Sequence, residues 1–154
     1  PPVYKMYSVS AVSFPGVRIL FYWVGGFALF AFMTTLIREI IKDIEDYEGD
    51  VTFDRKTLPV TSGIFATRII IVSLSVLTIF MLYIIWFRYL SDLITLAYIT
   101  LLIFAPFIWV IIKVMISKNR EELHTASRVM KIIMLAGILY SVVAGAIISS
   151  GKII

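Results

Sequence analysis

Apolar residues dominate four long stretches of this chain, and polar residues separate them. The stretches cover about residues 19–46, 64–87, 93–115 and 127–148. A helix rises about 1.5 Å per residue, so each stretch is long enough to cross about 30 Å of hydrocarbon. A soluble helix bundle would need polar faces on these helices, and they have almost none. The pattern therefore predicts an all-α membrane protein with about four transmembrane helices.

The composition supports this class and narrows the chemistry. The chain is 60% hydrophobic and 16% charged, whereas about 25% of residues are charged in a typical soluble domain. There is no cysteine, which excludes disulfides and thiolate metal sites. The single histidine, His124, excludes a multi-histidine zinc or haem site within the chain. Any bound metal is therefore expected to be a hard ion held by carboxylates, with Mg²⁺ the natural candidate.

The distribution of basic residues predicts an orientation. Ten of the fourteen lysines and arginines lie in or beside two connections, at residues 38–69 and 113–131. By the positive-inside rule, the loops at 43–62 and 116–126 are expected on the cytoplasmic side of the cytoplasmic membrane. Basic residues are not interleaved with aromatic ones, so no nucleic-acid partner is expected. The chain opens Pro1-Pro2 without a methionine or a signal-peptide pattern, which we interpret as an internal start.

Seven of the ten acidic residues fall between positions 39 and 54. Four of them are spaced by four, three and four residues, which places them on one side of a helix: Glu39, Asp43, Asp46 and Asp50. Like charges at this spacing repel each other, and a cation between them would reverse the sign of the interaction. Basic residues flank the row, and carboxylates with bases suit a magnesium–diphosphate ligand. The alternative is a solvated loop, but the position at a membrane helix end favours a site.

Two segments carry a resemblance to a known family. Residues 38–50 read REIIKDIEDYEGD, and residues 55–59 read RKTLP. Together they resemble the second aspartate-rich motif of the UbiA superfamily of intramembrane prenyltransferases, in the branch of the digeranylgeranylglyceryl phosphate synthases. The resemblance implies a nine-helix bundle of which this chain supplies the last four helices. It also implies Mg²⁺-dependent transfer of a prenyl group from a prenyl diphosphate to a lipid or glycerol-phosphate type of acceptor.

The resemblance also implies roles for individual residues. Matched position by position, the aspartates of the motif would hold the metal, and three basic residues would bind the diphosphate. The metal ligands implied are Asp43, Asp46 and Asp50, and the diphosphate-binding residues implied are Arg38, Lys42 and Lys56. Membrane lipids are expected partners, and other membrane subunits are a further candidate.

Two departures from the family pattern bear on activity. Asp54 stands where the family usually carries glycine, directly before Arg55-Lys56-Thr57. The family's first aspartate motif, NDxxDxxxD, has no counterpart in these residues. The chain alone is therefore expected to be inactive. The alternative is a catalytically inactive UbiA-like subunit with a structural role in a larger complex, and a weaker one is a fragment of a cation-binding transporter.

Three other features of the sequence have simpler interpretations. Small residues recur every four positions at Gly137, Ser141 and Gly145, which predicts a helix-packing face. His124 is expected to be a solvated surface residue. For Arg68, one turn inside the second apolar stretch, the sequence leaves two interpretations open: snorkelling to the interface and phosphate binding.

Overall fold

The computed structural model describes residues 15–117 and 119–149, and these residues are almost entirely helical. The first long helix is α1 (Pro15–Glu45), followed by two short helices, α2 (Tyr47–Thr52) and α3 (Leu58–Ser62). Helix α4 (Ile64–Ile85) continues into the π-helical η2 (Trp86–Leu90). Then come α5 (Leu93–Tyr98), the π-helical η3 (Ile99–Phe104), α6 (Ala105–Ile116) and α7 (Arg120–Ser149).

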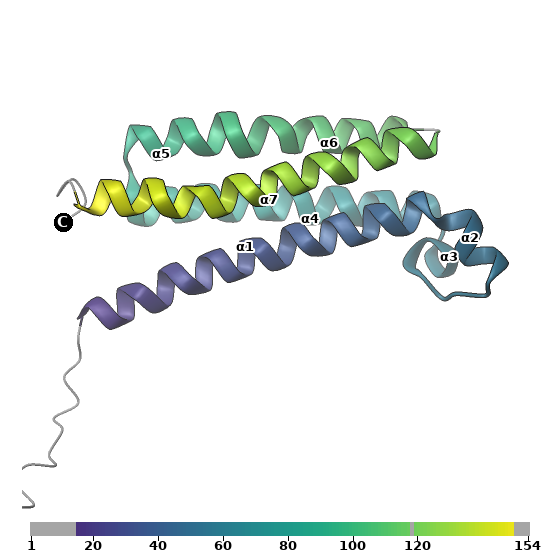
Figure 1. Cartoon of the computed structure of the whole chain (residues 1–154), viewed down its shortest axis with the longest axis horizontal. Coiled ribbons are helices and arrows are strands. Elements are labelled where there is room, and N and C mark those ends of the chain that lie inside the picture. The colour runs from purple at the N-terminus through teal and green to yellow at the C-terminus, as the bar shows by residue number, and fades with distance from the viewer. Residues whose placement is uncertain (1–14, 118, 150–154) are drawn as a thin grey trace, which may run out of the picture.

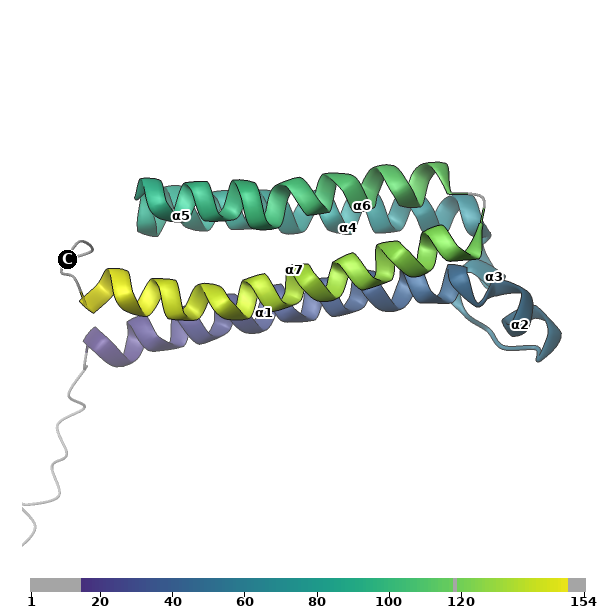
Figure 2. The same cartoon turned by 45° about the horizontal axis from the view of Figure 1, so that its top comes forward.

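The four membrane-length helical segments lie side by side as a bundle (Figure 1). Helix α1 packs against α7 and α4, and α6 packs against α7 and α4. Helices α2 and α3 lie at one end, close to the start of α7, and the turn between η2 and α5 lies at the other (Figures 1 and 2). The connections predicted to share one side of the bilayer therefore do lie at the same end of the bundle.

The bundle has an apolar core and an apolar outer surface. The largest fully buried apolar side chains are Ile37, Ile41, Ile71, Phe107, Val110, Val114, Met130 and Ile133. Large apolar residues are also exposed on the outside, including Phe32 at 61% and Val142 at 70%. Helices that are apolar all round belong in a membrane rather than in water. Four segments are long and apolar enough to span one: Phe21–Glu45, Ile64–Tyr89, Leu93–Ile116 and Arg120–Gly145. The predicted all-α membrane fold is confirmed.

The start of α7 differs from the sequence prediction. The helix begins at Arg120, seven residues before the predicted position. Glu121 and Glu122 occupy its first turn, where the helix dipole favours negative charge. Leu123 and Ala126 are buried in the bundle and give this polar stretch a packing face. The predicted loop at 116–126 is therefore mostly helix.

Two further local features were not predicted in this form. The connection at 47–63, expected as a polar loop, contains α2 and α3. Gly63 joins α3 to α4 with φ of 84°, a conformation that glycine adopts without a steric cost. Pro106, which has no N–H to donate, lies in the first turn of α6, two residues after the end of the π-helical η3. The backbone hydrogen-bond pattern therefore changes from α-helical to π-helical in the segment before the proline.

Candidate functional site

The predicted row of acids lies where α1 meets α2. Asp46 separates the two helices, with φ of −95° and ψ of 8°. The hydrogen-bond ladder nevertheless continues across it, because Asp46 N donates to Lys42 O at 2.9 Å and Asp50 N donates to Asp46 O at 3.0 Å. The aspartates therefore keep nearly helical spacing. Asp43 lies within electrostatic reach of Asp50, Glu39 and Asp46, as the spacing predicted.

The end of α2 brings Arg55 back over Asp50. Arg55 N donates to Asp50 O at 2.9 Å and Asp54 N donates to Val51 O at 3.3 Å, which together form a Schellman motif. This motif requires a residue with positive φ, and Asp54 has φ of 52°. The same turn places Arg55 Nη1 3.7 Å from the buried carboxylate of Asp50. The resemblance implies glycine at position 54, and the turn gives the physical reason: the position needs a positive φ, which Asp54 adopts in this chain.

The three predicted diphosphate-binding residues have different surroundings. Arg38 is partly buried and forms an ion pair with its neighbour Glu39, while its Nε atom is buried without a hydrogen-bond partner. Lys42 on α1 and Lys56, between α2 and α3, are both exposed. All three belong to the end of the bundle that carries the acids. Their roles toward a diphosphate stay predictions.

The first turn of α7 contacts the acids, which the sequence analysis did not foresee. Arg120 Nη2 donates to Asp46 Oδ1 at 2.7 Å. His124 Nδ1 lies 2.8 Å from Glu45 Oε1, and the Glu45 side chain is only 11% exposed. His124 is therefore a half-exposed partner of α1 rather than a freely solvated residue. The i, i+4 spacing of Arg120 and His124 was the signal available in the sequence.

The acids are not gathered into a closed metal site. Across residues 15–117 and 119–149, no three side chains of histidine or acidic type lie close enough to hold an ion together. Asp46 and Asp50 each already contact an arginine. Mg²⁺, however, is commonly held by one or two carboxylates together with substrate phosphates rather than by a complete protein cage. The donor chemistry of Asp43, Asp46 and Asp50 fits such a shared site.

Arg68 is explained by a structural contact. Its guanidinium donates to Ser117 O at 2.6 Å and to Met115 O at 3.2 Å. These carbonyls lie at the end of α6, where the last backbone acceptors lack helical donors. Arg68 therefore ties α4 to the end of α6.

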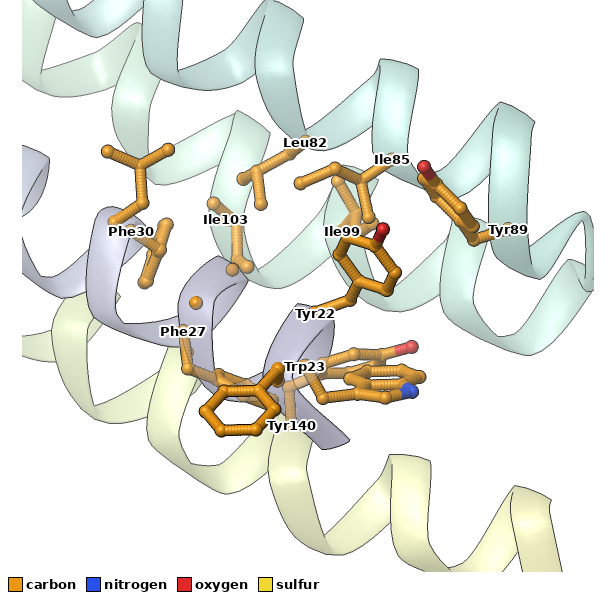
Figure 3. A pocket seen from close by; sticks show the side chains of 15 residues that line it. Tyr22, Trp23, Phe27, Phe30, Leu82, Ile85, Tyr89, Ile99, Ile103 and Tyr140 are labelled. Carbon is orange, nitrogen blue, oxygen red and sulfur yellow. The ribbon is translucent and has the colours of Figure 1, made fainter. Parts of the chain in front are cut away.

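An apolar cavity of about 550 Å³ lies toward the other end of the bundle (Figure 3). Trp23 of α1 stacks on Phe27 and on Tyr140 of α7 on one side of it, and Phe27 lies tilted against Tyr140, with ring centroids 6.0 to 6.5 Å apart. Leu82 and Ile103 lie across from them. The predicted metal ligands do not line this cavity. The expectation that they converge on a cavity of their own stays a prediction.

The predicted small-residue packing face is confirmed at Gly137 only, because Ser141 and Gly145 are exposed and nothing lies within 4 Å of a Cβ added at Gly145. A Cβ added there would overlap the ring of Phe30, with Phe30 Cδ1 at 2.7 Å. Only glycine permits this close approach of α7 to α1. Tyr98 donates to Ala136 O at 2.7 Å, and Tyr140 shares a hydrogen bond of 2.8 Å with Thr95. These contacts satisfy hydroxyl groups within the bundle.

Four segments that are long and apolar enough to span a membrane define an integral membrane protein, and its acids and bases meet where α1, α2 and the start of α7 come together. The chain belongs to the UbiA prenyltransferase family, whose sequence model matches residues 2–135. It is similar to the digeranylgeranylglyceryl phosphate synthase of Methanosphaera stadtmanae, with 37% identity over 114 residues, covering 71% of this chain and 41% of the relative.

Other relatives carry the same name. The enzyme of Methanopyrus kandleri is 32% identical over 115 residues, which cover 72% of this chain and 40% of the relative. That of Saccharolobus solfataricus is 61% identical over 36 residues, 23% of this chain and 13% of the relative. The chain thus spans about two fifths of the length of the first curated relatives it matches. No solved structure matches it.

Proposed function

We propose that this chain forms part of an enzyme that transfers a prenyl group from a prenyl diphosphate to a glycerol-phosphate type of lipid acceptor, on the cytoplasmic side of the cytoplasmic membrane. The observation that carries this proposal is the acid row, Glu39, Asp43, Asp46 and Asp50, held in helical register across the α1–α2 joint. The names of the relatives support the type of acceptor.

The residues of the chain have distinct parts in this reaction. Asp43, Asp46 and Asp50 would hold Mg²⁺, which when bound neutralises charge on a departing diphosphate. Arg38, Lys42 and Lys56 would bind phosphate oxygens, since arginine and lysine form charge-assisted hydrogen bonds with them. The acceptor hydroxyl attacks the allylic carbon, the bond from that carbon to the diphosphate oxygen breaks, the diphosphate leaves with the electron pair, and the hydroxyl proton is released. The apolar helices keep water from the reacting carbon.

The function also requires acids that these 154 residues do not contain. The first aspartate motif of the family must come from another part of the same polypeptide or from another chain. A second candidate function, an inactive structural subunit, is favoured by one observation: Arg120 and Arg55 already pair with Asp46 and Asp50. In that case the row of acids would serve to join helices rather than to bind a metal.

The test compares variants of the intact membrane protein. Asp46→Ala and Asp50→Ala are expected to abolish Mg²⁺-dependent prenyl transfer and to leave the fold intact. The fold survives because each change removes a like-charge neighbour. The lost pairs, Asp46 with Arg120 and Asp50 with Arg55, are each worth about 0–1 kcal/mol, since the two arginines are 72% and 70% exposed. Glu48→Ala is the matched control, since Glu48 is exposed on the same short helix and outside the row.

Helix content, detergent stability and transfer are measured on the same preparations. Unfolded variants would show that the acids are structural, as the second candidate requires. Folded variants that transfer at the wild-type rate would refute the enzymatic role of the row.

A further inference from the structure

A second row of polar residues runs along α7. Arg120, His124, Arg128 and Lys131 are spaced by four, four and three residues, so they share one side of the helix. We call these four residues the basic row. All four are exposed, whereas Leu123, Ala126 and Met130 between them are buried in the bundle. The basic row is therefore on the outer surface of α7.

Two residues of the basic row contact acids at the end of α1. Arg120 and His124 reach Asp46 and Glu45 across the α1–α7 interface. Helices α1 and α7 run side by side in opposite directions from this point (Figures 1 and 2). Glu39 and Asp43 of the acid row lie on α1, and the basic row lies on the neighbouring helix α7. Arg128 and Lys131 continue the basic row away from the bundle end.

Arg128 and Lys131 differ from Arg120 and His124 in their surroundings. Among the residues that the structure describes, no carboxylate lies within ion-pair distance of either one. They follow Arg120 by eight and eleven residues, or roughly 12 and 16 Å along the helix axis. They lie inside the segment Arg120–Gly145, which is apolar enough to span a membrane. They lie near the start of this segment, where arginine and lysine side chains extend to the level of the lipid headgroups and their phosphates.

We propose that Arg128 and Lys131 bind the phosphate headgroup of the acceptor lipid. This inference rests on the proposed function, in which both substrates are phosphorylated. The bases of the acid row, Arg38, Lys42 and Lys56, would be occupied by the diphosphate, so the acceptor needs a separate cationic site. A phosphate bound at this position leaves its lipid chain in the bilayer, on the helix that packs against α1 with Glu39 and Asp43. The arginine fork suits a terminal phosphate, which it can bind with two parallel hydrogen bonds.

The test is equilibrium binding to the intact, detergent-solubilised protein without Mg²⁺ or prenyl diphosphate. The probe is a radiolabelled isoprenyl glycerol monoether phosphate, and the reference is the same monoether without phosphate. Arg128→Gln and Lys131→Gln should each weaken binding of the phosphate probe about tenfold and leave the neutral probe unchanged. Arg128→Lys should restore part of the affinity. Arg88→Gln is the matched control, because Arg88 is an exposed base in η2, at the opposite end of the bundle.

Each outcome bears on one claim. Wild-type affinity in both variants would overturn the inference. Displacement of the probe by an excess of phosphatidylglycerol would also overturn it, because these bases would then bind bulk lipid headgroups only. In transfer assays the variants should raise the KM for the acceptor and leave the KM for the diphosphate unchanged. Selective binding without any transfer would contradict the proposed function alone. Transfer with an unchanged acceptor KM would contradict the inference alone.

Discussion

Replacing Gly137 by alanine should destabilise the bundle, although alanine is the better helix former. The added methyl group would overlap the buried ring of Phe30, whose Cδ1 and Cζ atoms lie 2.7 and 3.1 Å from the Cβ position. Overpacking of this kind costs about 1–3 kcal/mol. The gain in helix propensity offsets up to about 1 kcal/mol of that cost. The net loss in free energy of unfolding is therefore expected to be up to about 2 kcal/mol.

Gly145→Ala is the matched control on the same helix. Nothing lies within 4 Å of the Cβ position there, so only the propensity gain of up to about 1 kcal/mol remains. Thermal or denaturant unfolding in detergent should thus separate the two variants by about 1–3 kcal/mol, with Gly137→Ala the less stable. Phe30→Leu, which shortens the opposing side chain, should narrow the gap. Equal stability of the two glycine variants would refute the packing of α7 on Phe30.

Three further changes have definite expected outcomes. Asp54→Gly should raise the free energy of unfolding by up to about 1 kcal/mol, because glycine adopts the φ of 52° without strain. Asp54→Val should lower it, and a gain in stability with valine would contradict the positive φ at this position. Asp92→Ala should cost about 1 kcal/mol, since its carboxylate caps α5 by accepting from Thr95 N at 2.7 Å, and Asp92→Asn should keep most of the stability. Arg68→Met should speed hydrogen exchange at the end of α6, where two carbonyls lose their donor; unchanged exchange would count against that contact.

The sequence predicted the membrane helices well because their signal is local. Uninterrupted apolar stretches state directly which segments can cross a bilayer, and three of the four predicted ranges agree closely with the structure. The range of α7 was too short because hydropathy does not recognise its polar first turns. Buried Leu123 and Ala126, three residues apart, carried the missing helical signal.

The contacts within the site were predictable only in part. Spacing placed the acids on one side of a helix, since helical register needs no knowledge of the fold. The partners of Asp46 and Glu45 lie 74 and 79 residues away in the sequence, on α7. Such pairs depend on how two helices pack against each other, and a local sequence pattern does not predict that packing. The positive φ of Asp54 could not be predicted either. Aspartate can adopt this conformation, but unlike glycine it is not a sequence signal for it.

Binding of the diphosphate tests the central claim most directly. Equilibrium dialysis of a radiolabelled prenyl diphosphate against the intact protein, with and without Mg²⁺, compares the wild type with Asp46→Asn, Asp50→Asn and the control Glu48→Gln. If the acid row holds the metal, wild-type and Glu48→Gln protein bind the diphosphate only with Mg²⁺, and both asparagine variants lose at least tenfold in affinity, or about 1.4 kcal/mol. Equal affinity in all four proteins, or binding that ignores Mg²⁺, would contradict the account.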